Sequence, residues 1–128
     1  MVGYSGTPLP QKIGIKPGLT VFLDRAPASL AEQGVTGLTR LPKQFDIALT
    51  FHESTATLTR RFPQLIERMT TAGMIWVCWP KKASKVPTDL DDNVVRTLGL
   101  ELGIVDVKVA AIDEVWSGLK FVRRLADR

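Results

Sequence analysis

The chain is poor in the residues that most often carry reactive chemistry. Among its 128 residues there is one cysteine, Cys78, and one histidine, His52. A single cysteine cannot form an internal disulfide, and one cysteine with one histidine cannot supply the several ligands that a zinc site needs. We therefore expect no disulfide within the chain and no metal centre.

Long apolar runs are also missing. No stretch approaches the roughly 18 consecutive apolar residues of a membrane-spanning helix, and residues 1–16 lack the apolar core of a secretory signal. A content of 45% hydrophobic and 23% charged residues is typical of a globular domain. We expect an irregular arm at residues 1–12, one domain over residues 13–128, no membrane association and a cytoplasmic location.

The charge balance is basic, but its pattern is not that of a nucleic-acid-binding protein. The formal net charge is +4 and the sequence pI is about 9.5. The basic residues are scattered as Arg60-Arg61, Lys81-Lys82 and a C-terminal group, without an aromatic-rich ribonucleoprotein motif or zinc-finger spacing. We interpret them as a solvated basic surface, and weak nucleic-acid binding is the alternative.

Hydrophobic periodicity predicts alternating strands and helices. Strands are predicted at residues 19–23, 35–41, 45–51, 74–79, 105–112 and 119–125, the second being the weakest. Helices are predicted at residues 28–33, 54–72 and 88–102. Pro63 predicts a kink or restart in the second helix, and Gly73 its end. Thr88 and Asp91 have capping-box spacing at the start of the third helix, and Gly103 is its left-handed stop.

This order of elements predicts the fold class. The last two strands are too close for a crossover helix between them and must form a hairpin. The sequence therefore predicts an α/β fold of three layers, with a Rossmann-like, mostly parallel sheet and an antiparallel C-terminal hairpin. An exposed strand edge at this hairpin would make a homodimer possible.

Polar residues follow several of the predicted strands. Asp24 and Arg25 follow the first strand, His52 and Glu53 follow the strand at residues 45–51, and Asp113 follows the strand at residues 105–112. The carboxyl ends of parallel strands share one edge of a sheet, so these side chains are predicted to meet in a cleft. His52, Glu53, Asp24 and Asp113 are the acid/base candidates, and Arg25 is a candidate ligand for an anion.

The segment from Gly73 to Lys82 combines a core strand with a charged end. Cys78 is predicted to be a packed and inert thiol, and Trp76 and Trp79 are predicted to point to opposite faces of the sheet. Near the strand end, Trp79 could form a wall of a ligand site, and Lys81 and Lys82 could hold an anion. The alternative is a solvated loop.

Several motifs resemble known families. Residues 16–21, 45–48 and 72–75 resemble the segments around the first, fourth and fifth strands of class I S-adenosylmethionine-dependent methyltransferases, and the terminal hairpin resembles their antiparallel finish. Residues 76–82, 105–109 and 116–121 resemble more closely a family of short bacterial proteins classified as a domain of unknown function. That second resemblance covers nearly the whole chain and implies no activity.

The chain departs from the methyltransferase pattern where a cofactor would bind. A nucleotide-type cofactor needs glycines after the first strand and an acidic residue after the second. Here the first turn reads Asp24-Arg25-Ala26-Pro27 without glycine, and the residues after the predicted second strand are Pro42 and Lys43. We therefore expect no cofactor bound in the manner of that family.

These observations leave two classes of function open. The first hypothesis is a non-catalytic or cryptic Rossmann-like module that binds a small anionic ligand or a protein partner at the carboxyl edge of the sheet. The alternative is a small enzyme that uses His52 and neighbouring carboxylates for acid/base chemistry.

Overall fold

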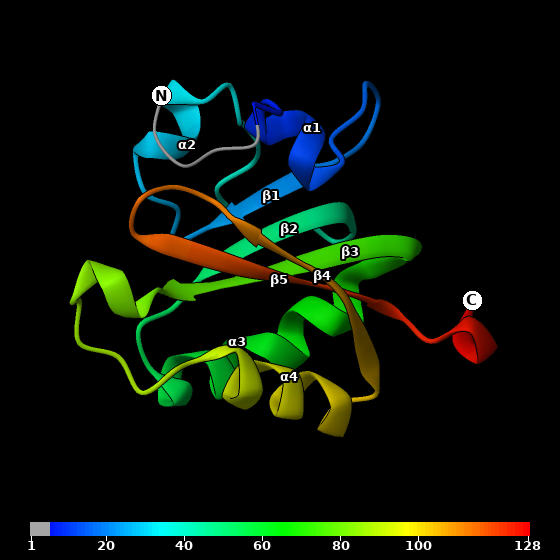
Figure 1. Cartoon of the computed structure of the whole chain (residues 1–128). Coiled ribbons are helices and arrows are strands. Elements are labelled where there is room, and N and C mark those ends of the chain that lie inside the picture. Colours follow the sequence, from blue (N-terminus) through cyan, green and yellow to red (C-terminus); the bar gives the residue numbers. More distant parts are fainter. Residues whose placement is uncertain (1–5) are drawn as a thin grey trace.

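A central mixed sheet organises the chain. The computed structural model describes residues 6–128, which form a five-stranded sheet between two layers of helices (Figure 1). The strands are β1 (Val21–Asp24), β2 (Phe45–Phe51), β3 (Met69–Pro80), β4 (Ile104–Ala111) and β5 (Trp116–Arg123), in the spatial order β1-β2-β3-β5-β4. The first three pair in parallel, and β5 is antiparallel to both β3 and β4. The predicted α/β fold with an antiparallel hairpin is confirmed, although its last strand is inserted within the sheet.

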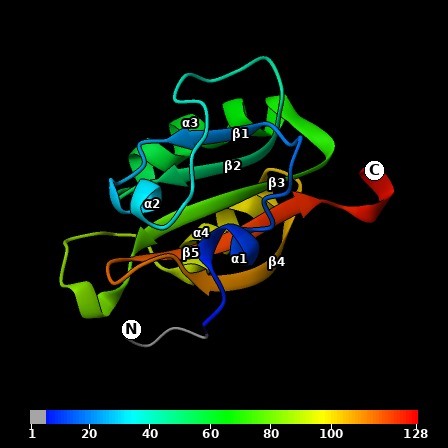
Figure 2. The same cartoon turned by 90° about the horizontal axis from the view of Figure 1, so that it is seen from above.

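Helices cover both faces of this sheet. The short helices α1 (Leu9–Ile13) and α2 (Ser29–Glu32) lie on one face, and α3 (Thr55–Arg68) and α4 (Asp92–Glu101) lie on the other (Figures 1 and 2). Trp76 packs in the core beneath α1 and α2, whereas Trp79 packs in the core beneath α3 and α4. The prediction that the two tryptophans point to opposite faces is therefore confirmed.

The predicted N-terminal arm is partly structured. Residues 1–5 lie outside the described residues, but Leu9–Ile13 form a helix whose two end residues are buried. The indole Nε1 of Trp76 donates a hydrogen bond of 3.1 Å to the carbonyl of Ile13. Residues 9–12 thus belong to the domain, because α1 covers the central strand β3 from above.

The weak strand predicted at residues 35–41 is wrong. The segment makes one isolated parallel bridge, between Leu38 and Phe22 of β1. Val35 is buried, but Leu38 is 50% exposed, so the segment has no continuous apolar face to hold it on the sheet. It instead forms an irregular cover over the end of β1.

Helix α3 continues through Pro63, so the predicted restart at this residue is wrong. Both Pro63 and Thr59, whose carbonyl loses its helical partner, are exposed, so water can replace the missing N–H donor. The helix ends at Arg68, and Gly73 lies within β3 rather than at a helix end. A Cβ on Gly73 would lie 2.9 Å from the carbonyl oxygen of Asp46, so this glycine permits an irregular pairing of β2 with β3.

Helix α4 is capped by Asp91 rather than Thr88. The carboxylate of Asp91 accepts from the backbone N–H of Val94 at 2.8 Å, whereas the hydroxyl of Thr88 donates to the carbonyl of Glu53 at 2.6 Å. Gly103 has a φ of 91°, which confirms the predicted left-handed stop.

The side of α4 that faces the sheet carries Val94, Val95, Leu98 and Gly99. The fully buried residues of the helix are Val95 and Gly99, and Leu102 is 39% exposed. Gly99 lets the ring of Phe121 pack directly against the helix backbone, because a Cβ at this position would overlap ring carbons.

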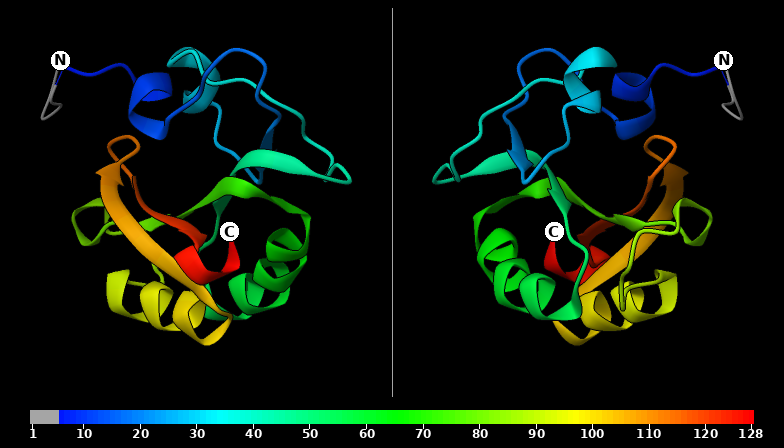
Figure 3. Two further views of the ribbon diagram at one scale, coloured as in Figure 1. Left: turned by 90° about the vertical axis from the view of Figure 1, so that its right-hand side faces the viewer. Right: turned by 90° about the vertical axis from the view of Figure 1, so that its left-hand side faces the viewer.

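Strand β4 forms one edge of the sheet. Asp106 lies beside an irregularity in the pairing of β4 with β5, which falls between it and Lys108. Its carboxylate accepts from Nε of Arg96 at 2.9 Å. Two side views of the molecule show β4 at one border and α4 below it (Figure 3).

No helix of residues 6–128 is both long and apolar enough to cross a membrane.

Candidate functional site

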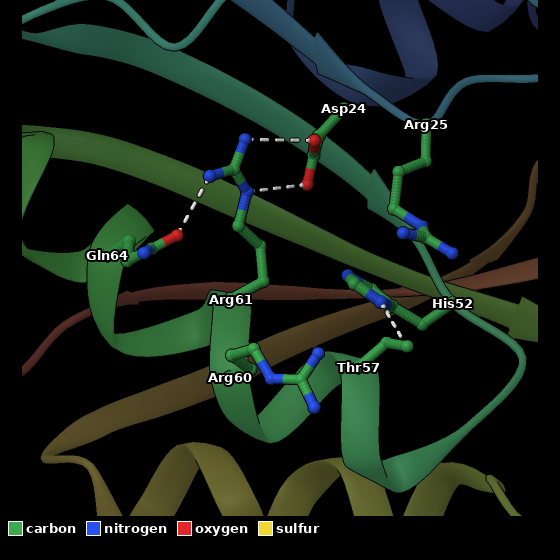
Figure 4. Close-up of a pocket in the computed structure, with 7 residues that line it drawn as sticks. All are labelled: Asp24, Arg25, His52, Thr57, Arg60, Arg61 and Gln64. Carbon is green, nitrogen blue, oxygen red and sulfur yellow. Dashed lines mark hydrogen bonds and ion pairs between the residues drawn. The ribbon is translucent and has the colours of Figure 1, made fainter.

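A cavity of about 290 Å³ lies where the carboxyl ends of β1 and β2 meet α3. The pairing of Asp24 with Thr50 places the two strand ends side by side. The first turns of α3 complete the cavity from the other side (Figure 4). Its lining consists of Asp24, Arg25, His52, Thr57, Arg60, Arg61 and Gln64.

An ion pair closes one wall of the cavity. Arg61 donates two hydrogen bonds to the carboxylate of Asp24, from Nε to Oδ2 at 3.0 Å and from Nη2 to Oδ1 at 3.1 Å. The hydroxyl of Thr50 donates a third bond to Oδ2 at 2.7 Å. Asp24 is 7% exposed, so its carboxylate is committed to these partners and is not a free base.

His52 is held by threonines at both ring nitrogens. The distance from Nε2 to Oγ1 of Thr50 is 2.7 Å, and the distance from Nδ1 to Oγ1 of Thr57 is 2.9 Å. The one hydroxyl proton of Thr50 already goes to the carboxylate of Asp24, so this hydroxyl must accept from Nε2–H. In the neutral ring Nδ1 then accepts from the hydroxyl of Thr57, which defines the tautomer.

The surroundings of His52 keep its ring neutral. Burial lowers the pKa of His52 to about 4, with a further lowering by the charge of Arg25 and a smaller one by Arg61, against the raising effect of Asp24. The ring itself is buried, with 1% of the residue exposed. At neutral pH the histidine therefore forms part of the cavity wall without adding charge.

Two further arginines bring positive charge to the cavity. Arg25 has a φ of 60°, a conformation that is unfavourable for residues other than glycine, and its Nε donates to the carbonyl of Phe51 at 3.1 Å. Arg60 is exposed, and its side chain has no hydrogen bond or ion pair with any residue of the described part of the chain. Arg25 and Arg60 lie on either side of the His52 ring in the view of Figure 4. Neither guanidinium has an acidic partner among residues 6–128.

The structure brings together three of the residues predicted from the sequence, Asp24, Arg25 and His52. Glu53 is exposed and does not line the cavity. Asp113 lines a different cavity beside α2, where it accepts from the hydroxyl of Ser29 at 2.6 Å and from the backbone N–H of Trp116 at 2.7 Å. The carboxylate of Asp113 therefore shapes the turn between β4 and β5.

The end of β3 also lies away from this cavity. Trp79 is 5% exposed and packs in the core, so it cannot form a wall of the cavity. Lys81 donates its backbone N–H to the carbonyl of Val115, and Lys82 is exposed in a short 3-10 helix (Lys82–Ser84). Cys78 is buried, and burial raises the pKa of its thiol, as expected for a packed and inert cysteine.

The sequence-based prediction of the site did not include residues of α3. Thr57, Arg60, Arg61 and Gln64 follow the spacing i, i+3, i+4 and i+7, which places them on one face of a helix. This polar face lies beside the buried apolar face of Leu58, Phe62 and Leu65. A search for helical spacing among polar residues, as well as apolar ones, would have found it.

Comparisons with known proteins identify the fold. No protein-family profile and no curated protein sequence matches the chain. Magnesium protoporphyrin IX methyltransferase from Synechocystis PCC 6803, solved with bound SAH, matches with a TM-score of 0.60 and 13% identity over 90% of this chain and 78% of that one. The ribosomal protein L11 methylase of Lactobacillus delbrueckii subsp. bulgaricus matches with a TM-score of 0.57 and 12% identity over 91% and 75%. A SAM-dependent methyltransferase from Aquifex aeolicus matches with a TM-score of 0.54 and 12% identity over 87% of this chain and 85% of that one.

These matches show that the chain has an α/β, Rossmann-like methyltransferase fold. Identities of 12–13% to these structures establish the fold alone.

The residues at the end of β1 do not fit S-adenosylmethionine. In place of a glycine turn that lets backbone approach a cofactor, Arg25 lays its side chain across the gap to Phe51. The cofactor carries a positive sulfonium, and the cavity already holds three arginines against the one carboxylate of Asp24. A neighbouring cavity, between β1 and α2, has no acidic residue in its lining to hold ribose hydroxyls.

Proposed function

We propose that this protein binds a small anion, a phosphate or carboxylate group, in the cavity between β1, β2 and α3. The observation that carries the proposal is the pair of guanidinium groups of Arg25 and Arg60, which border the cavity without an acidic partner. The one acidic residue in the lining, Asp24, is already neutralised by Arg61. An anion would supply the missing acceptor for both arginines.

The neutral state of His52 supports the same conclusion. Burial is the largest cause of the lowered pKa of His52, and the positive charges of Arg25 and Arg61 lower it further. Because both ring nitrogens already have hydrogen-bond partners, His52 could accept a proton at Nδ1 only if the hydroxyl of Thr57 turned its own proton to the carbonyl of Ser54. These contacts favour a role for His52 in shaping the site over a role as general base.

Titration with inorganic phosphate tests the proposal. A ligand that binds the folded state alone raises the midpoint of thermal unfolding, and at one hundred times its Kd it adds about 2.7 kcal/mol to the free energy of unfolding. We expect phosphate and acetate to raise the midpoint in a saturable way at constant ionic strength, with chloride as the reference anion. Absence of saturation for both anions would refute the proposal.

Substitutions locate the binding site. Arg60→Met and Arg25→Met should each weaken phosphate binding roughly tenfold or more, since a hydrogen bond to a charged group contributes about 1.5–3 kcal/mol. Arg124→Met is the matched control, because Arg124 is an exposed arginine near the C-terminus that lines none of the cavities described above. Equal losses in all three variants would indicate nonspecific attraction to a basic protein. Lys82→Met tests the sequence-based prediction for Lys82 in the same assay.

Methyl transfer is a second candidate, because matching structures include methyltransferases with bound SAM or SAH. The poor fit of the β1 turn to this cofactor argues against it. Titration with S-adenosylmethionine separates the two candidates. Saturable binding that persists in Arg25→Met, the variant that weakens the anion site, would favour methyl transfer over the anion site.

A further inference from the structure

A second cavity lies directly beside the anion site. It measures about 410 Å³ and is bordered by the end of β1, helix α2 and the irregular segment that follows α2. Its lining includes Leu23, Pro27, Leu30, Ala31 and Val35, with hydroxyls from Thr36 and Thr39. This cavity is therefore mainly apolar, unlike the arginine-rich cavity beside α3.

Arg25 is the one residue common to the two linings. It directly follows Asp24, the last residue of β1. Its Nε is held by the carbonyl of Phe51, and its positive φ fixes the backbone at this point. Arg25 thus borders both cavities.

From this arrangement we infer that the ligand is an organic anion with an apolar tail, such as an alkyl or aryl phosphate or carboxylate. This inference rests on the proposed anion site. The charged group binds among Arg25, Arg60 and His52, and the tail passes Arg25 into the cavity beside α2. The apolar side chains there gain contact with the tail, while the absence of acidic side chains from that lining avoids repulsion of the anion.

Methyl phosphate and hexyl phosphate test the inference, because they share a charged group and differ in the length of the tail. Each methylene that is buried in the apolar cavity favours binding. Together these contributions should make the affinity for hexyl phosphate at least about tenfold higher than that for methyl phosphate. Affinities are measured by calorimetric or NMR titration of the full chain at one pH and one ionic strength.

Two variants at and next to α2 locate the tail. Ala31→Phe puts a large side chain at an exposed position in the lining of the apolar cavity, and it should remove the advantage of hexyl phosphate while leaving the affinity for methyl phosphate unchanged. Ala28→Phe is the matched control, since Ala28 is exposed and lies outside both linings. Arg60→Met should weaken both ligands by the same factor. Thermal melts of each variant confirm that it is folded.

The outcomes are distinguishable. Equal affinities for the two phosphates would overturn the inference and leave the anion site intact. An advantage of hexyl phosphate that survives Ala31→Phe would also overturn it, because the tail would then lie elsewhere. If neither phosphate binds, the proposed function itself fails.

Discussion

The ion pair between Arg61 and Asp24 gives the sharpest test of how the site is built. In Arg61→Met the methionine keeps much of the apolar stem but removes both hydrogen bonds to the carboxylate. Removing one partner of a fully buried pair costs about 3–5 kcal/mol. The side chain of Arg61 is 28% exposed and that of Asp24 is 9% exposed, so solvent reduces the effect. We expect a loss of about 2–3 kcal/mol in the free energy of unfolding at pH 7.

Urea unfolding followed by circular dichroism measures this loss. Arg60→Met is the matched control, because Arg60 is the neighbouring arginine on α3 and lacks a partner in the described part of the chain. It should change the free energy of unfolding by less than about 0.5 kcal/mol. The double variant Asp24→Asn with Arg61→Met should be more stable than the sum of the single losses predicts, with a coupling of about 1–2 kcal/mol. Equal effects of Arg61→Met and Arg60→Met would refute the reasoning.

Three further predictions concern the site and its support. The pKa of His52 is lowered to about 4, so the unfolded chain binds more protons between that value and 6.5; stability should fall by about 1–3 kcal/mol as pH drops through this window. In His52→Asn this part of the pH dependence should be absent. If the urea midpoint of the variant varies with pH as that of the wild type does, His52 is not the group responsible. Gly99→Ala should destabilise by about 1–3 kcal/mol although alanine is the better helix former, because the new methyl would overlap the Phe121 ring; a rise in the melting midpoint would show that the ring can move. Ser54→Ala removes the acceptor for the N–H of Thr57 and should cost about 1 kcal/mol of stability, measured by urea unfolding, whereas Ser54→Asp should not.

Helices and strands that are specified by their own residues could be predicted directly from the sequence. Strand β2 has the predicted bounds, because a seven-residue segment that is apolar except at Asp46 and Thr50 can be buried on both faces of a sheet. The start of α3 was also readable, since Ser54 caps it through a bond to a residue three positions away. Such signals are local, so they survive without knowledge of the rest of the fold.

The secondary-structure predictions were wrong where the local sequence around a residue is compatible with two structures. Gly73 can end a helix or permit close approach within a strand, and the contact that decides between them comes from Asp46 on another strand. Leu38 sits in a strand-like pattern, but with only one bridge to β1 its side chain stays half exposed.

The sequence by itself determined the alternation of strands and helices, the inert burial of the one cysteine, and the end of β1 and β2 as the place for polar chemistry. Only the tertiary structure decided which charges remain free. It commits Asp24 to Arg61 and Asp113 to a turn, places Trp79 in the core, and leaves Arg25 and Arg60 beside a neutral His52. The physical reason is that the protonation state of an ionisable group and its availability to a ligand depend on its partners and its burial. Both are set by residues that are distant along the chain.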